Sequence, residues 1–164
     1  MAAPNNKYEF TGEVNARGLK RIRRISDQSL GGFIETEENL SVNGPSWIDN
    51  RAEVYGLASV SGNARVSGSA KICGNAKVSG NAKVRDFAEV CDNAEVSGNA
   101  IVGGYVVVYG NARITGSSRI YDSAQIFGGA KVNDDVHVSD RAKISGTADL
   151  RGNRKVTDET HVQE

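Results

Sequence analysis

Residues 75–84 read N-A-K-V-S-G-N-A-K-V, which is one six-residue unit followed by most of a second copy. The same frame extends in both directions, so that residues 39–164 divide into 21 hexads without an insertion. The fourth position is Val, Ile or Leu in all 21 hexads, the second is Ala in 14, and the sixth is Gly in 13 and Asp in six. Self-similarity at a fixed short period is typical of a solenoid.

Alternation along an extended chain assigns a direction to each position of the hexad. Successive side chains of a β-strand point to opposite faces, so the Ala and the aliphatic residue point inward while the third and fifth positions point outward. Gly or Asp at the sixth position supplies a corner, where positive φ is often needed. A period of six does not match an α-helix, and every hexad contains a corner residue. The repeat therefore predicts a coil of short strands.

The composition agrees with a thin, repetitive fold. The 164 residues include 19 Gly but only one Trp, five Tyr and four Phe, too few aromatic residues for a wide core. The formal net charge is zero, which argues against a dedicated nucleic-acid or membrane-surface binder. The sequence has no apolar signal-peptide core and no run near the roughly 20 apolar residues of a membrane span. A soluble, cytoplasmic protein is expected.

Variants of V-S-G-N-A-K recur from residue 39 to residue 164, and in this the chain resembles the hexapeptide-repeat left-handed β-helix family. The resemblance implies a triangular prism of about seven coils, each of three hexads; the left hand comes from the resemblance alone, since parallel crossovers generally favour the right hand. In acyltransferases of the family, Gly usually follows the aliphatic residue directly, whereas here Ser, Tyr or Cys intervenes. Residues 30–41, L-G-G-F-I-E-T-E-E-N-L-S, are closer in look to uncharacterised hexapeptide-repeat proteins of bacteriophages and prophages. That likeness implies a bacterial host.

Residues 1–38 lie outside the frame and are predicted to form an N-terminal cap on the β-helix of residues 39–164. Residues 8–10 and 19–25, separated by N-A-R-G, predict a β-hairpin. The first coil of a solenoid leaves an unpaired edge, and we expect the cap to cover it. Three apolar residues are expected against the coil: Leu30, Phe33 and Ile34.

A coil of 18 residues stacks residues 18 apart and sorts the outward positions onto three faces. The first face has mixed charge and an Asn ladder, which is typical of solvated surface. Its mid-strand residues are Ser41, Ser59, Lys77, Glu95, Arg113, Lys131 and Asp149, and the ladder is Asn75, Asn93 and Asn111.

The third face has an outward apolar row. Contiguous exposed apolar surface usually marks an interface, and trimeric members of the family associate side by side. The alternative is that these residues add only cross-strand packing. We predict a homotrimer interface formed by Tyr55, Phe87, Tyr105, Val107, Tyr109 and Phe127.

The second face and the cap carry the candidate partner-binding residues. A stripe of basic side chains on the second face could bind a phosphate, a nucleotide or an acidic protein, although its hexads contain six Asp as well as six Lys and Arg. Solvated surface is the favoured interpretation there. The basic run of the cap could bind an acidic partner or a nucleic-acid backbone; the alternative is the solvated side of a hairpin. The candidates are Arg17, Lys20, Arg21, Arg23, Arg24, Trp47, Arg65, Lys83 and Arg119.

Residues that could support catalysis or bind metal are few. Cys73 and Cys91 stack within disulfide range, but their Cβ atoms point the same way and the cytoplasm is reducing, so free thiols are expected. The two histidines, His137 and His161, are 24 residues apart and hence on different faces. No His, Cys or carboxylate cluster has metal spacing, and no nucleophile–base pair can be identified. We expect no catalytic residue, no metal and no cofactor.

These features favour a non-catalytic binding or assembly protein that presents flat faces to a protein partner. An inhibitor of a host defence or replication protein is one form of this function that the phage resemblance implies. One alternative is an acyltransferase that uses His137, and another is a structural component of a phage particle. Nucleic acid or a nucleotide is a less favoured partner, and no membrane partner is expected.

Overall fold

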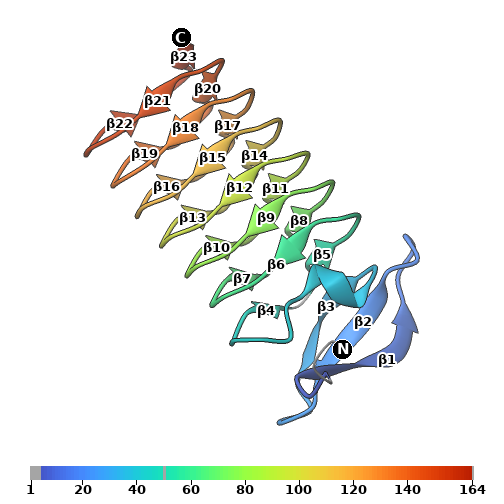
Figure 1. Ribbon diagram of the computed structural model, residues 1–164. Coiled ribbons are helices and arrows are strands. Elements are labelled where there is room, and N and C mark those ends of the chain that lie inside the picture. Colours follow the sequence, from blue (N-terminus) through green and yellow to red (C-terminus); the bar gives the residue numbers. More distant parts are fainter. Residues whose placement is uncertain (1–4, 50, 164) are drawn as a thin grey trace.

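The computed structural model describes residues 5–49 and 51–163. The chain forms an all-β parallel solenoid of about seven coils (Figure 1). Three sheets run along the solenoid and form the faces of a triangular prism. The described ranges contain no α-helix, and no helix in them is long and apolar enough to cross a membrane. The fold class is confirmed, while the hand of the coil stays a prediction.

Each predicted face corresponds to one sheet. The first face is the six-stranded sheet of β6 (Ser59–Val60), β9 (Lys77–Val78), β12 (Glu95–Val96), β15 (Arg113–Ile114), β18 (Lys131–Val132) and β21 (Asp149–Leu150). The second is the seven-stranded sheet of β4 (Trp47–Ile48), β7 (Arg65–Val66), β10 (Lys83–Val84), β13 (Ile101–Val102), β16 (Arg119–Ile120), β19 (His137–Val138) and β22 (Lys155–Val156). The third is the ten-stranded sheet of β1 (Tyr8–Val14), β2 (Lys20–Arg24), β3 (Leu30–Ile34), β5 (Glu53–Val54), β8 (Lys71–Ile72), β11 (Glu89–Val90), β14 (Val107–Val108), β17 (Gln125–Ile126), β20 (Lys143–Ser145) and β23 (His161–Gln163). A 3-10 helix, η1 (Glu37–Asn39), leads into the first face.

Neighbouring coils are in parallel register 18 residues apart, as the hexad frame predicts. Lys77 pairs with Glu95, and the inward Val78 and Val96 beside them are fully buried. The backbone ladder runs between coils, for example from the Ser79 N–H to the Val96 carbonyl at 3.0 Å. The core is therefore a narrow column of Ala and aliphatic side chains along the prism axis. From residue 51 to residue 150, the inward second and fourth positions and the outward third position of the hexad are confirmed.

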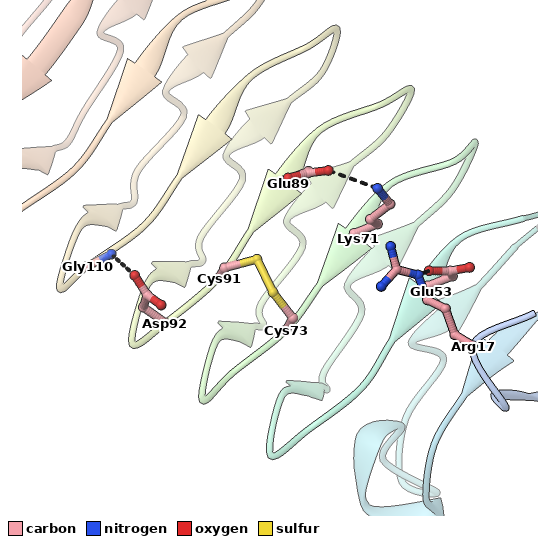
Figure 2. The surroundings of a disulfide bond; sticks show 8 residues. All are labelled: Arg17, Glu53, Lys71, Cys73, Glu89, Cys91, Asp92 and Gly110. Carbon is pink, nitrogen blue, oxygen red and sulfur yellow. Dashed lines mark hydrogen bonds and ion pairs between the residues drawn. A yellow bond between two sulfur atoms is a disulfide. The ribbon is translucent and has the colours of Figure 1, made fainter.

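The corners between faces adopt left-handed backbone conformations. Asp92 has a φ of 59°, and Gly110, one coil later, has a φ of 71°. The Asp92 carboxylate also accepts a hydrogen bond from the Gly110 N–H at 3.0 Å (Figure 2). Asp can replace Gly at a corner for two reasons. Among non-Gly residues it adopts the left-handed backbone conformation at a small cost in free energy, and its carboxylate accepts a hydrogen bond from a corner N–H. The same contact joins Asp86 to Gly104, Asp122 to Asp140, Asp134 to Gly152, and Asp140 to Asp158.

The predicted cap hairpin is present and gains a third strand. Strand β1 pairs antiparallel with β2, and β2 pairs antiparallel with β3. Strand β3 then pairs in parallel with β5, so it is also the first strand of the third face. Phe33 and Ile34 are buried as predicted, but Leu30 is 54% exposed. The prediction for Leu30 is wrong because β5 pairs only with Phe33 and Ile34, which leaves the start of β3 beyond the coil.

The first hexad departs from the frame. Leu40, rather than Val42, pairs with Val60 and is buried. The preceding Asn39 is buried, and its side-chain amide donates to two carbonyl oxygens of the next coil at 3.0 and 2.8 Å. These bonds hold this segment two residues out of register with the hexad frame, so that Leu40 takes the place that the frame assigns to Val42. Ser41 is therefore not the mid-strand residue that the frame predicted.

Candidate functional site

Two stacked pairs of aromatic rings and one Val lie on the third face. The Phe87 and Tyr105 rings stack with their centroids 5.0 Å apart, and the Tyr109 and Phe127 rings stack at the same distance. Val107 lies between Tyr105 and Tyr109 along the chain, at the outward position of β14. These five residues are called the aromatic strip below. The predicted stacking of Tyr109 on Phe127 is confirmed.

The aromatic strip is most exposed at one edge. Phe87 is 54% and Tyr105 64% exposed, whereas the other three side chains are half-buried. The stacking of the rings follows from the coil, because residues 18 apart in the sequence are separated by one strand spacing of about 4.8 Å. The strip spans three coils, with Phe87 before β11 and Phe127 directly after β17. The structure thus brings five of the six predicted interface residues together.

The sixth, Tyr55, lies outside the aromatic strip, because Cys73 and Cys91 take the equivalent positions in the two coils between Tyr55 and Tyr109. These two cysteines form a disulfide (Figure 2). The prediction of free thiols is wrong. Equivalent positions of adjacent coils place the two Cα atoms 4.6 Å apart, within the disulfide range. Rotation about each Cα–Cβ bond then joins the sulfur atoms although both side chains point outward. The Tyr55 ring instead lies under the Arg17 guanidinium, 5.6 Å from it.

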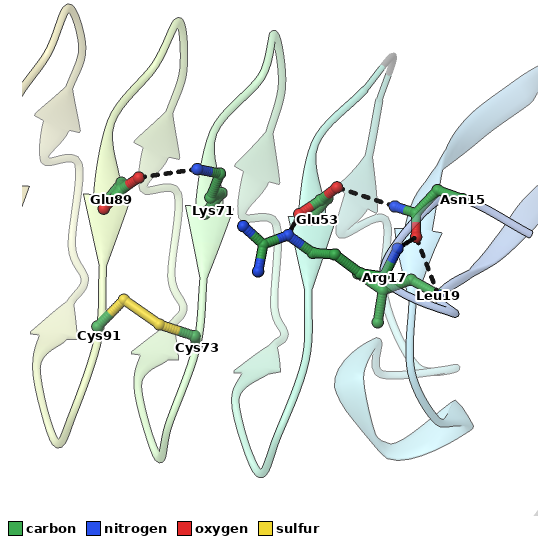
Figure 3. A network of polar contacts seen from close by, with 8 residues as sticks. All are labelled: Asn15, Arg17, Leu19, Glu53, Lys71, Cys73, Glu89 and Cys91. Atoms are coloured by element: carbon green, nitrogen blue, oxygen red, sulfur yellow. Dashed lines mark hydrogen bonds and ion pairs between the residues drawn. A yellow bond between two sulfur atoms is a disulfide. The ribbon is translucent and has the colours of Figure 1, made fainter.

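Charged side chains connect the cap to the third face beside the disulfide (Figure 3). The Asn15 amide donates to Glu53 Oε1 at 2.8 Å, and Arg17 Nε lies 3.1 Å from Glu53 Oε2. In the following coils, Lys71 Nζ donates to Glu89 Oε1 at 3.0 Å. These charges are therefore neutralised inside the chain, next to the uncharged aromatic strip.

Every basic residue predicted in the cap contacts an acidic or aromatic group of the same chain. Cross-strand pairs of opposite charge stabilise a hairpin, and cations pack on aromatic rings. This arrangement favours a structural role, and binding of an acidic partner by the cluster stays a prediction. The contacts are Glu53 for Arg17, the Phe10 ring for Lys20, Glu13 for Arg21, Glu9 for Arg23 and Asp27 for Arg24.

Trp47 is 2% exposed, contrary to the prediction that it points into solvent on the second face. The cap covers this end of the solenoid, and the Arg24 guanidinium lies 4.3 Å from the centre of the indole ring. Arg65, on the next strand of the face, pairs with Asp49 at 2.6 Å. Arg24, Trp47 and Arg65 therefore line one hollow, together with Lys7. Lys7 was missed because an isolated Lys in the cap has no motif, and only the packing of the cap brings it there.

The remaining candidates of the second face lie farther along the solenoid. Lys83 is on β10 and Arg119 is on β16, with Ile101 of β13 between them. Arg119 Nη1 lies 3.2 Å from His137 Nε2 on β19. These residues do not reach the hollow under the cap.

The two histidines lie on different sheets, as predicted. His137 Nδ1 is 3.1 Å from the Asp135 carbonyl oxygen, and His161 Nε2 is 2.8 Å from Ser145 Oγ. Over residues 5–49 and 51–163, no group of three or more His, Cys, Asp and Glu side chains is placed to hold a metal ion.

Residues 58–70 and 108–122 match the YdcK beta solenoid repeat. The first segment includes β6 and β7, and the second runs from the end of β14 to the corner after β16. This match supports a β-solenoid repeat protein, in agreement with the observed coils. No curated protein matches the chain. The likeness to bacteriophage and prophage proteins stays a prediction.

Proposed function

We propose that this protein is a non-catalytic assembly protein whose aromatic strip is the contact between copies of the chain, associated side by side as a homotrimer. The observation that supports this most directly is the strip itself, an uncharged row of stacked rings on a flat face. Two of its rings are more than half exposed.

The size of the strip is consistent with the centre of an interface. A buried aromatic side chain covers about 150–250 Å², so the exposed parts of four rings offer roughly 300 Å² per copy. At about 25 cal/mol per Å², burial of the strips of two copies contributes roughly 15 kcal/mol. That is comparable to the estimated cost of association, about 4–15 kcal/mol. The remainder of the face must add contacts for a stable complex, as the polar rim does in known interfaces.

The surroundings of the strip favour a second copy as the partner. A rotation about an axis parallel to the prisms keeps every residue at its own level, so in a three-fold arrangement the three strips can converge on the symmetry axis. The carboxylates nearest to the strip are paired internally, as Glu89 is with Lys71. Where equal levels of two copies meet, the carboxylates beside the strips are therefore each neutralised by a cation of their own copy.

The contacts of His137 also support a non-catalytic role. This is the residue that an acyltransferase of this architecture would use, and both of its ring nitrogens lie within hydrogen-bond distance of other atoms of the chain. The flat faces outside the strip could serve a second protein partner, such as a host defence or replication protein.

The test replaces Tyr109 and Phe127 together by Lys, which puts repelling charges into the proposed contact and leaves every inward residue unchanged. The control replaces Ser79 and Ser97 by Lys; these have the same hexad position and the same 18-residue spacing on the first face. We expect the first double variant to stay folded by circular dichroism but to fall to monomer mass by light scattering. The control should keep the wild-type mass. A wild type that is monomeric at micromolar concentration would refute the proposal.

A further inference from the structure

A hollow of about 410 Å³ opens where the cap meets the first strands of the second face. Its lining includes three cationic side chains, Lys7, Arg24 and Arg65, and the buried Trp47. The three cations come from separate parts of the chain: the segment before β1, the end of β2, and β7. The hollow exists only because the cap folds over the second face.

Lys7, which lines the hollow, retains an unused hydrogen-bond donor. Its ammonium donates to the Ser41 carbonyl oxygen at 2.7 Å and to Ser46 Oγ at 3.0 Å. An ammonium has three N–H donors, so two neutral acceptors leave one donor over. Among the described residues no carboxylate lies within ion-pair distance of Lys7, whose charge is therefore not neutralised by a direct partner.

The two guanidinium groups are each held by a carboxylate at one nitrogen. Arg24 Nη1 lies 3.3 Å from Asp27 Oδ2, and Arg65 Nε lies 2.6 Å from Asp49 Oδ2. A guanidinium has five N–H donors on three nitrogens. Within the described ranges the other two nitrogens of each group have no hydrogen-bond partner. The carboxylates thus orient both groups and leave donors unused.

The local charge is positive. Three cations stand against two carboxylates, and burial together with the nearby Arg24 lowers the pKa of Lys7 to about 8. Burial disfavours the charged form of Lys7, and Arg24 adds a repulsion between like charges. An anion bound between these groups would offset that repulsion and use their spare donors.

We propose that this hollow binds the phosphoryl group of a small phosphate ligand. Phosphoryl oxygens accept hydrogen bonds from several directions, which suits donors that converge from three segments, and Arg binds them in bidentate fashion. The volume falls in the range of small-molecule sites, about 300–1,000 Å³, and so has room for a phosphate monoester. The neutral Asn6 and Ser26 of the lining offer further polar contacts. The Trp47 ring is not open to stacking by a nucleobase, because the Arg24 guanidinium already covers it.

The test is a calorimetric titration at constant ionic strength with inorganic phosphate in one arm and ribose 5-phosphate in the other. We expect saturable binding in at least one arm. Tighter binding of ribose 5-phosphate identifies a monoester as the ligand, whereas equal affinity identifies free phosphate. No saturable binding in either arm overturns the proposal.

Four variants locate the site. Lys7→Gln and Arg65→Gln should each weaken binding by about ten-fold or more, the usual effect of losing a charged hydrogen bond. Arg119→Gln is the matched control, since it removes the same charge from the same face three strands away. The double variant Arg65→Gln/Asp49→Asn keeps the net charge of the wild type and should remain weak, because it still lacks the Arg65 donors.

Two results would overturn the assignment. One is an equal loss of affinity in Arg119→Gln and Arg65→Gln, which would indicate a diffuse charge effect. The other is wild-type affinity in the double variant. The Arg65 side chain is 58% exposed, so its replacement should leave the fold intact even if Lys7→Gln loosens the cap. Circular dichroism checks both variants.

Discussion

Replacement of Asp92 separates the two physical effects that hold a corner of the solenoid. In the structure this residue has a φ of 59°, and its carboxylate accepts a hydrogen bond from the Gly110 N–H at 3.0 Å. Asp92→Ala removes the hydrogen bond and places a Cβ-bearing residue without a local acceptor in the left-handed region. Asp92→Gly removes the same hydrogen bond, but Gly adopts this conformation without strain. The difference between the two variants therefore reports the backbone term alone.

The expected magnitudes follow from these contacts. A hydrogen bond to a charged group contributes about 1.5–3 kcal/mol, and because the Asp92 corner is exposed to water we take a net loss of about 1 kcal/mol. A left-handed non-Gly residue costs about 1–2 kcal/mol. Asp92 already bears part of this left-handed cost in the wild type. Asp92→Ala should thus lower the free energy of unfolding by about 1–3 kcal/mol, and Asp92→Gly, which relieves that cost, by about 1 kcal/mol or less. For a chain of this size each kcal/mol corresponds to about 2–4 °C in Tm.

Guanidinium chloride unfolding, followed by circular dichroism with the disulfide intact, measures both variants. Lys77→Ala is the control, since an outward mid-strand side chain should matter by about 0.5 kcal/mol or less. If Asp92→Gly were destabilised as much as Asp92→Ala, the left-handed backbone would not be the source of the difference and the reasoning would be refuted.

Two further predictions concern the disulfide and the cap. The disulfide between Cys73 and Cys91 closes a loop with a sequence separation of 18 residues. Its reduction should lower the free energy of unfolding by up to about 3 kcal/mol in the chain-entropy model. Thiol titration of the unfolded, unreduced protein should find no free thiol, and two free thiols would contradict the disulfide. Since burial and Arg24 lower the pKa of Lys7 to about 8, the unfolded chain binds more protons than the folded one between pH 8 and the ordinary Lys value of 10.5, so this contribution to stability rises with pH across that window. Burial raises the pKa of Tyr8 to about 12, so the folded chain keeps a proton that the unfolded chain loses, and this contribution falls as pH rises from 10 to 12. Urea unfolding at a series of pH values should show the rise in the wild type and its absence in Lys7→Met; parallel curves would contradict the assignment.

The coil itself follows from local regularity. A strict hexad with alternating inward and outward positions specifies where each side chain points, because alternation is a property of the extended chain and needs no knowledge of distant segments. The 18-residue stacking then follows from three equal hexads. For this reason the stacks of Tyr109 on Phe127 and of Asn75 on Asn93 were predictable from spacing alone.

The sequence by itself therefore determined the solenoid, its three faces and the members of the aromatic strip. Only the tertiary structure decided what happens where the repeat meets something else. The side-chain bonds of Asn39 shift the first hexad, the cap buries Trp47, and the same cap brings Lys7 beside Arg24. The reason is physical: a repeat contacts copies of itself at a fixed spacing, whereas a cap contacts the coil through side chains whose distance in space is unrelated to their distance along the chain.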